Sequence, residues 1–375
     1  YLVRYLTDIS SSLDNSETLE IFSASRNGND FYCDFFETKT IKSIINEINP
    51  NVVVNCIAIT SLEYCERNPE ECLQVNGYAP GYLAEICKEK NSRLIQVSTD
   101  HFYEDDGPKA HKENDKTFFL NEYAKSKLIA ESEITKRGRN FLILRTSIIG
   151  LTKEQRSYLD WILENINHSR EVGLYFNAYT SLIHCKQLSR IILELAQNKH
   201  LSGLYNISNK NVFSKGDLYL RIAKRFGVEP IYKKEDLNSQ LLKRSISCGL
   251  SPSKIESKSD LSMPSLEDLV ECIFQEQQEI ANKKGYERRK SLKVQKVINR
   301  MIPYAKQDIS DEDIDSVTEV LKSDFLTQGN QVPLFEDVIS NHVGAKYALA
   351  ANSATSCLHL SCLSLGLSKG DILWT

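Results

Sequence analysis

The chain has 375 residues, of which 41% are hydrophobic and 26% charged, and its formal net charge is −4 at pH 7. This balance offers no basic excess for nucleic acid and no apolar span for a membrane, so it predicts a cytoplasmic protein without either partner. The ten cysteines form no C-x-x-C pair, which argues against disulfides and against a metal site. Cys56 and Cys272 stand in apolar runs, where a cysteine usually serves as a small buried hydrophobe.

The first 144 residues alternate between strand and helix patterns. Strands are predicted at 19–25, 51–56, 94–97 and 141–144, and helices at 40–48, 78–89 and 123–137. Alternation of this kind predicts an α/β fold with a doubly wound parallel sheet and right-handed crossovers.

From about Gly150 the order changes to helices joined by loops. Helices are predicted at 157–165, 186–198 and 214–226, the last with Ser214 as its N-cap. Residues 276–300 are rich in Lys and Arg, but glutamates interrupt them, so they are interpreted as a solvated helical linker rather than a phosphate-binding surface. At 375 residues, the length also predicts more than one domain.

Tyr123 and Lys127 carry the Y-x-x-x-K spacing, which places a phenol and an ammonium one helical turn apart on one face. Such a pair can transfer a proton beside a hydride carrier, because a neighbouring ammonium lowers the pKa of a phenol from about 10 toward working pH. Upstream, strand 94–97 is followed by Ser98 and Thr99, at the sheet edge where open α/β folds place reacting groups. Taken alone, the spacing is common in Lys-rich helices, and a hydroxyl at a strand end can simply cap a loop.

Together with other motifs, these residues resemble the extended short-chain dehydrogenase/reductases, specifically the dTDP-4-dehydrorhamnose reductase type. The further motifs are 51–58 followed by Thr60, Val75 with Asn76, and 144–147. The resemblance covers about residues 1–275 and implies a Rossmann-like cofactor part over about 1–150 and a smaller substrate lobe over about 151–275. Segments 177–184 and 204–208 resemble stretches that cross back to extend the sheet, and 263–269 resembles the start of the last helix.

The resemblance implies reduction of the C4 ketone of a nucleotide-linked 4-keto-6-deoxy sugar in cell-surface polysaccharide biosynthesis. Tyr123 would donate the proton, Thr99 would hydrogen-bond the ketone oxygen, and Lys127 would assist Tyr123 and hold the nicotinamide ribose. Arg26 stands where a basic residue meets a 2′-phosphate, which favours NADP over NAD, although it can also be an exposed loop cation. The implied cofactor contacts are Arg26, Asp34, Phe35, Ile57, Ala58, Thr60, Ser98 and Lys127.

Two departures from the family pattern leave the sugar open. His101 replaces a more usual Tyr, and the loop 102–109 is altered. A nucleotide-sugar 4-epimerase with the same Tyr and Lys and a non-catalytic NADP-binding regulatory subunit remain alternatives. A sugar 4,6-dehydratase fits less well, because that type carries Asp-Glu after the Thr and here His101 follows Asp100. The nucleotide base and the oligomeric state, a homo-oligomer included, are also open.

The beginning of the chain resembles the helix that follows the G-x-x-G-x-x-G turn of such reductases. This turn, whose backbone N–H groups bind the cofactor pyrophosphate, is not found in the sequence, and neither is the strand before it. We therefore expect weak or no reductase activity from these 375 residues by themselves.

Residues 301–375 are similar to the opening of the DegT/DnrJ/EryC1/StrS-type sugar aminotransferases, especially the UDP-4-amino-4,6-dideoxy-N-acetyl-beta-L-altrosamine transaminase type. A helix capped by Ser310 and segments 324–330 and 343–356 carry the similarity. It implies that Ser353, Ala354 and Thr355, between a strand and the helix 356–365, bind the phosphate of pyridoxal phosphate in a complete unit. Without the similarity, plain helix capping would explain them. The Schiff-base Lys is expected beyond residue 375, so no transamination is expected here.

Overall fold

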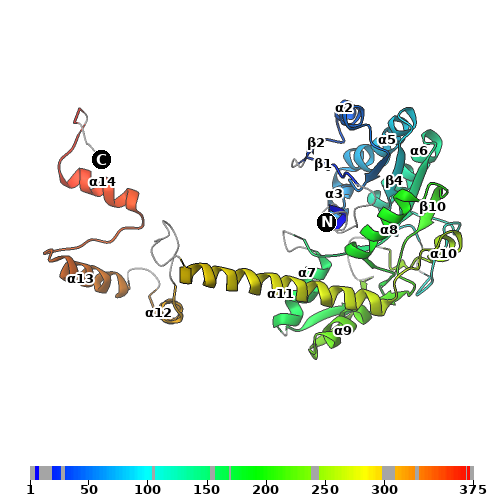
Figure 1. Ribbon diagram of the computed structural model, residues 1–375. Coiled ribbons are helices and arrows are strands. Elements are labelled where there is room, and N and C mark those ends of the chain that lie inside the picture. Colours follow the sequence, from blue (N-terminus) through cyan, green and yellow to red (C-terminus); the bar gives the residue numbers. More distant parts are fainter. Residues whose placement is uncertain are drawn as a thin grey trace. The chain divides into compact units, whose positions relative to one another are not determined.

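The computed structural model describes most of the chain, in two compact units that divide it at residues 291 and 292. Figure 1 shows both units, coloured along the sequence. Of the described helices, none is both long and apolar enough to cross a bilayer. The described residues are 5–7, 19–26, 30–103, 106–152, 157–168, 170–237, 245–297, 309–325, 329–368 and 370–371.

A four-stranded parallel sheet lies at the centre of unit 1. Its strands, in spatial order, are β10 (Gly203–Asn206), β5 (Phe141–Arg145), β4 (Arg93–Val97) and β3 (Val52–Asn55). All five residues of β4 are buried, as expected for an inner strand of a sheet covered on both faces. The predicted parallel α/β sheet is therefore confirmed, and the segment predicted at 204–208 does extend it, as β10.

Helices cover each face of this sheet, because alternate strand residues point to opposite faces. On one face Leu94 and Ile143 pack against α2 (Thr38–Ile48), α5 (Ala79–Glu89) and α6 (Glu122–Arg137). On the other face Ile95 and Leu142 pack against α8 (Cys185–Gln197). Burying each such side chain stabilises the fold by about 1.5–3 kcal/mol. The helices predicted at 40–48, 78–89, 123–137 and 186–198 are confirmed within three residues at their ends.

A second apolar cluster joins the helices that follow the sheet. It brings together α7 (Tyr158–His168), α9 (Lys215–Arg225), β7 (Val172–Tyr175) and the start of α11 (Leu266–Val297). The predicted cap is confirmed, since Ser214 Oγ accepts a hydrogen bond from Asp217 N at 2.9 Å. The other described elements of unit 1 are α3 (Leu62–Arg67), α4 (Pro69–Cys72), the π-helix η1 (Leu73–Tyr78), β6 (Ile148–Ile149), β8 (Tyr179–Thr180), β9 (Ile183–His184), β11 (Phe213–Ser214), β12 (Tyr232–Glu235), β13 (Ser247–Cys248) and α10 (Ser253–Lys258).

Two strand predictions in unit 1 are wrong. Of the segment 19–25 only β1 (Ala24–Ser25) is a strand, paired with β2 (Phe31–Tyr32). The carboxylate of Asp30 accepts from Ser23 N at 2.7 Å, so a main-chain donor that would lengthen the ladder bonds to a side chain instead. The segment 177–184 does not join the central sheet. Its strands β8 and β9 pair in two small separate sheets.

The packing of unit 1 continues past residue 275, where the linker was predicted to begin. Glu276 is 4% exposed. Its carboxylate accepts a hydrogen bond from the hydroxyl of Tyr5 and lies 3.2 Å from His184 Nε2. The first turns of α11 therefore belong to the core of unit 1.

Unit 2 contains three described helices, namely α12 (Asp311–Lys322), α13 (Gln331–Val343) and α14 (Ala354–Ser364). The predicted Ser310 cap is confirmed, as part of a capping box with Asp313. The strand predicted before residue 353 is wrong, because residues 345–353 form no strand. Phe335 is 58% exposed and Leu349 75%, so neither buries its apolar surface. A strand needs a pairing partner, and the described part of unit 2 provides none.

Candidate active site

The site is built where β4 ends and α6 begins. The side chain of Asn121 caps α6 by accepting from Ala124 N at 2.8 Å, which places Tyr123 in the first turn and Lys127 in the next. Lys127 Nζ donates to the carbonyl oxygen of Val97 at 2.8 Å and so ties the helix to the strand end. Thr99, two residues beyond β4, hydrogen-bonds the Tyr123 side chain. The structure therefore brings together the three residues that the sequence analysis selected as catalytic.

Burial sets the protonation of this pair. It raises the pKa of Tyr123 to about 12, although the hydrogen bond with Thr99 acts in the opposite direction. It lowers the pKa of Lys127 to about 8, against the opposing charge of Glu131. We expected the Lys127 ammonium to lower the phenol pKa. That expectation is wrong for the protein without ligands, because desolvation outweighs the other influences on Tyr123.

A buried ion pair connects the strands and the helix that carry the site. Arg145, on β5, binds Glu131 of α6 through two nitrogens, with Nη2 2.7 Å from Oε2 and Nε 3.0 Å from Oε1. Ser98 Oγ donates to the same carboxylate at 2.6 Å, and Arg145 Nη1 donates to the Tyr103 hydroxyl at 3.0 Å. Sequence reasoning missed Glu131, although its place four residues after Lys127 on one helical face was a usable signal. Arg145 lay in a motif to which no role was given.

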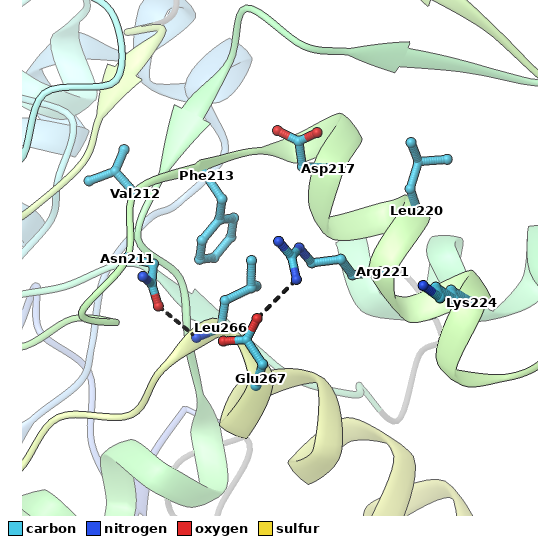
Figure 2. A pocket seen from close by; sticks show the side chains of 9 residues that line it. All are labelled: Asn211, Val212, Phe213, Asp217, Leu220, Arg221, Lys224, Leu266 and Glu267. Atoms are coloured by element: carbon cyan, nitrogen blue, oxygen red, sulfur yellow. Dashed lines mark hydrogen bonds and ion pairs between the residues drawn. The ribbon is translucent and has the colours of Figure 1, made fainter.

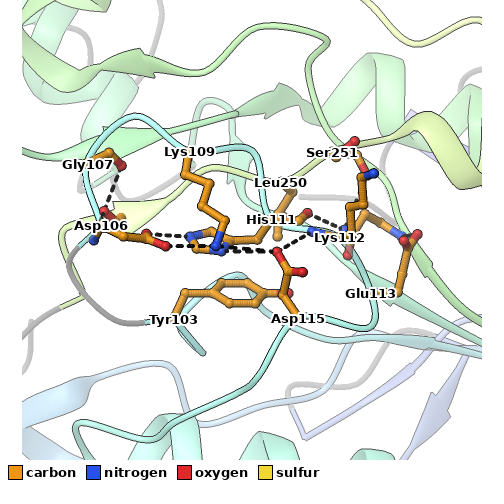
Figure 3. Close-up of polar contacts among 12 residues, drawn as sticks. Tyr103, Asp106, Gly107, Lys109, His111, Lys112, Glu113, Asp115, Leu250 and Ser251 are labelled. Carbon is orange, nitrogen blue, oxygen red and sulfur yellow. Dashed lines mark hydrogen bonds and ion pairs between the residues drawn. The ribbon is translucent and has the colours of Figure 1, made fainter.

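Tyr103 extends this network to the loop that follows the strand. Figure 3 shows its ring beside His111. Its ring stacks on His111 with centroids 3.9 Å apart. His111 Nε2 lies 3.1 Å from Asp106 Oδ1, and Nδ1 lies 3.6 Å from Asp115 Oδ2. Burial lowers the pKa of His111, while Asp106 opposes this. The loop after Thr99 is thus held against the core by stacking and by polar contacts.

The residues expected at the nicotinamide side lie on the loop after β3. Ile57 and Ala58 are half-buried and Thr60 is exposed. The loop is held by Asn76, whose Oδ1 accepts from Ile59 N at 2.8 Å and whose Nδ2 donates to Ile59 O at 2.9 Å. Asn76 was part of a recognised motif, but its clamping of this loop was not foreseen.

The residues expected at the adenine side also come together. Arg26 Nε lies 3.4 Å from Asp34 Oδ1, and its side chain is 51% exposed. Phe35 is 4% exposed and packs in the core. The Ser98 hydroxyl donates its hydrogen to Glu131, so toward a ligand it can act only as a hydrogen-bond acceptor. The cofactor roles of these residues stay predictions.

Two further observations concern groups near the reacting residues. Cys56 is exposed rather than buried, because β3 ends just before it and the chain leaves the sheet. Asp100, His101 and Cys248 place potential metal-ligating atoms within 4.8 Å of one another. His101 also lies edge-on to Tyr123, with ring centroids 6.1 Å apart. No spacing pattern in the sequence predicted this group, and the predicted absence of a metal stays a prediction.

A pocket of about 380 Å³ lies elsewhere, between α9 and the start of α11 (Figure 2). Arg221 and Glu267 form an ion pair of 2.9 Å on its wall. None of the residues predicted to be catalytic or cofactor-binding lines it. The pocket is therefore separate from the candidate active site.

In unit 2 the residues expected to bind a phosphate lie at the N-terminus of α14. Ser353 Oγ accepts from Ser356 N at 3.2 Å and so caps the helix. Ala354 is the first helical residue, and Thr355 is exposed. Capping explains Ser353 in this structure, and the phosphate role of the three residues remains a prediction.

Comparison with protein families gives two matches. The family described as "RmlD substrate binding domain" matches residues 7–279. The "DegT/DnrJ/EryC1/StrS aminotransferase family" matches residues 307–375. The two matches agree with the two resemblances predicted from the motifs.

Curated relatives follow the same division. The probable low-salt glycan biosynthesis reductase Agl14 of Haloferax volcanii is 26% identical over 243 residues, which are 63% of this chain and 80% of the relative. The dTDP-4-dehydrorhamnose reductase of Burkholderia thailandensis is 31% identical over 184 residues, 47% of this chain and 61% of the relative. A UDP-4-amino-4,6-dideoxy-N-acetyl-beta-L-altrosamine transaminase of Campylobacter jejuni is 43% identical over 75 residues, but these are only 20% of each protein.

Solved structures support the fold. The dTDP-4-dehydrorhamnose reductase of Yersinia enterocolitica has a TM-score of 0.64 at 23% identity, covering 72% of this chain and 94% of that one. The enzyme of the same name from Bacillus anthracis, in complex with NADP, has a TM-score of 0.62 at 19% identity and covers 67% and 92%. A Thermus thermophilus UDP-glucose 4-epimerase in complex with NAD has a TM-score of 0.57 at 16% identity, covering 73% and 96%. At these identities the likeness shows a shared Rossmann-like fold.

Proposed function

We propose, from the premise that the chain belongs to the RmlD substrate-binding domain family, that unit 1 reduces the C4 ketone of a nucleotide-linked 4-keto-6-deoxy sugar. Relatives in this family are NAD(P)-dependent nucleotide-sugar reductases that act in glycan biosynthesis. The observation that carries the proposal is the grouping of Thr99, Tyr123 and Lys127 at the carboxyl end of β4. The cytoplasmic location predicted from composition is part of the same proposal.

The proposed proton donor is Tyr123. With a pKa of about 12 it keeps its proton at any ordinary pH, and the hydrogen bond with Thr99 orients the hydroxyl. As the ketone becomes an alkoxide, the phenol proton moves to that oxygen. The Thr99 hydroxyl supports the developing negative charge, and the Lys127 ammonium stabilises the phenolate that remains.

The exposed surfaces fit a dinucleotide in part. Arg26 offers a half-exposed guanidinium for a 2′-phosphate, and Ile57 and Ala58 offer a half-buried apolar wall for a nicotinamide ring. A bound NADPH would supply the hydride. Arg26 pairs with Asp34, but half of its side chain is still accessible. Because its guanidinium can therefore contact the 2′-phosphate that only NADP carries, Arg26 favours NADP over NAD. For unit 2 the proposed cofactor is pyridoxal phosphate, which the aminotransferase family uses.

The assay that tests the proposal follows NADPH oxidation with dTDP- and UDP-linked 4-keto-6-deoxy sugars and identifies the product by NMR. Net reduction at C4 is expected. Inversion at C4 of a nucleotide-linked 4-hydroxy sugar, with no net change in the cofactor, would instead identify a 4-epimerase. NADPH binding without turnover of any sugar would identify a non-catalytic subunit.

The lowered pKa of Lys127 predicts a specific pH dependence. Reduction should fall above about pH 8, where the ammonium loses its proton, whereas Tyr123 stays protonated until about pH 12. Over the same range the stability of the fold should rise, because between pH 8 and the ordinary value of 10.5 the unfolded chain binds the proton that the folded chain has released. Rate profiles and urea unfolding from pH 6.5 to 10 measure both effects.

Lys127→Met supplies the control for this prediction. The variant should lose the part of the stability rise that belongs to this group, and its residual rate should no longer change near pH 8. An unchanged pH profile in the variant would assign the titration to another group.

A further inference from the structure

Two buried cysteines are in contact with each other next to α6, the helix that carries Tyr123 and Lys127. Cys65 lies on α3 and Cys72 is the last residue of α4, and both are 0% exposed. Asn68 ends α3 and also begins α4, followed by Pro69, so the chain turns sharply between the two cysteines. Their sulfur atoms lie 2.8 Å apart, with Cys72 donating.

This separation is closer to a bond than to ordinary packing. A disulfide has a sulfur–sulfur distance of about 2.05 Å, so closing the gap needs a movement of only about 0.8 Å. The sequence did not predict this pair, because six residues separate the cysteines and they form no C-x-x-C motif. Only the turn at Asn68 brings them together.

The pair is joined to both halves of the candidate site. Cys72 Sγ lies 3.3 Å from Ser126 Oγ, and Ser126 stands on α6 between Tyr123 and Lys127. Asn76 Nδ2, which clamps the loop at Ile59, also donates to Cys72 Sγ at 3.3 Å. Cys65 Sγ lies 3.6 Å from the carbonyl oxygen of Ile59. A change at these sulfurs is therefore passed to the nicotinamide-side loop and to the catalytic helix through direct contacts.

We propose that Cys65 and Cys72 are a reversible dithiol–disulfide pair that oxidises in the presence of a low-molecular-weight disulfide such as glutathione disulfide. One cysteine thiolate attacks a sulfur of glutathione disulfide, which breaks its S–S bond and releases one glutathione. The second cysteine sulfur then displaces the other glutathione and forms the Cys65–Cys72 bond. The two cysteines lose two electrons and two protons, and glutathione disulfide becomes two thiols.

Burial makes this reaction slow but does not disfavour its product. Burial raises the pKa of the Cys65 thiol, and the hydrogen bond with Cys72 raises it further, so little of the attacking thiolate exists at neutral pH. The rate of disulfide formation should therefore increase with pH. The contact between the sulfurs favours the closed product, because few other arrangements are open to either side chain in a packed core.

Peptide mapping tests the proposal on the full chain. The folded protein is incubated with glutathione disulfide, free thiols are alkylated, and the chain is cut after glutamate. Cleavage at Glu63, Glu66, Glu71 and Glu85 leaves Cys65 in peptide 64–66 and Cys72 in peptide 72–85, each as its single cysteine. We expect these two peptides to be linked, with a mass about 2 Da below that of the separate thiols, and to separate again with dithiothreitol.

Variants and unfolded protein supply the controls. Cys87→Ser, at a buried cysteine of α5, should keep the link, whereas Cys65→Ser should lose it. Oxidation of the wild-type protein should raise the midpoint of thermal unfolding by about 5 °C, because the crosslink restricts the unfolded chain. The proposal is wrong if both cysteines of the folded protein are still free thiols, and so become alkylated, after incubation with glutathione disulfide. It is also wrong if the cysteines pair in the same pattern in folded protein and in urea.

Discussion

Replacing Tyr123 with phenylalanine should lower ketone reduction by about 10²- to 10⁴-fold while NADPH binding stays nearly unchanged. The ring keeps its place at the start of α6, and only the hydroxyl that hydrogen-bonds Thr99 is lost. Because that hydroxyl acts in the transition state, the loss should appear in kcat rather than in the dissociation constant of the cofactor. Single-turnover rates and fluorescence titration of NADPH measure the two quantities.

Thr99→Val is the matched variant for this experiment. It keeps the shape of the side chain but removes the hydroxyl that orients Tyr123, so a smaller loss of about 10- to 100-fold is expected. If Tyr123→Phe reduces the sugar as fast as the wild-type protein, Tyr123 is not the proton donor and the proposed function loses its main support.

The largest effect on stability should come from Glu131→Gln. Arg145 is 4% exposed, and the substitution removes the only carboxylate with which an ion pair is described for it. Removing one partner of a buried pair costs about 3–5 kcal/mol, because the remaining charge is left uncompensated in a low-dielectric interior. The free energy of unfolding, measured in urea, is the quantity to compare.

An exposed pair on the same chain shows what burial contributes. Lys42 and Glu89 form an ion pair of 2.9 Å with side chains 45% and 51% exposed, so Glu89→Gln should lower the free energy of unfolding far less than Glu131→Gln does. The double variant Glu131→Met with Arg145→Met should recover much of the loss, since no unpaired charge remains. Equal losses for Glu131→Gln and Glu89→Gln would refute the role of burial.

Glu131→Gln also connects stability with the chemistry. The carboxylate stands one turn beyond Lys127 and raises the pKa of that ammonium against the lowering effect of burial. Without it, the pH at which reduction begins to fall should move below 8. A shift in the pH profile would distinguish this positioning effect from simple loss of folded protein.

Local sequence patterns determined the α/β alternation, the caps at Ser214 and Ser310, and the pairing of Tyr123 with Lys127. Each of these depends on residues within about four positions of one another, so periodicity and side-chain chemistry suffice to predict it. The same reasoning failed at 19–25, where the Asp30 side chain takes a donor from the expected ladder.

The tertiary structure alone decided what those residues meet. The carboxylate of Glu131, on α6, forms an ion pair with Arg145 of β5. The side chain of Asn76 accepts a hydrogen bond from Ile59 N. The contact between Cys65 and Cys72 depends on a turn between two short helices. Burial, which raises the pKa of Tyr123 and lowers that of Lys127, is a property of the packed core and not of the spacing between the two residues. Sequence therefore identified the reacting groups, while their charges and supports follow from contacts between segments distant in the chain.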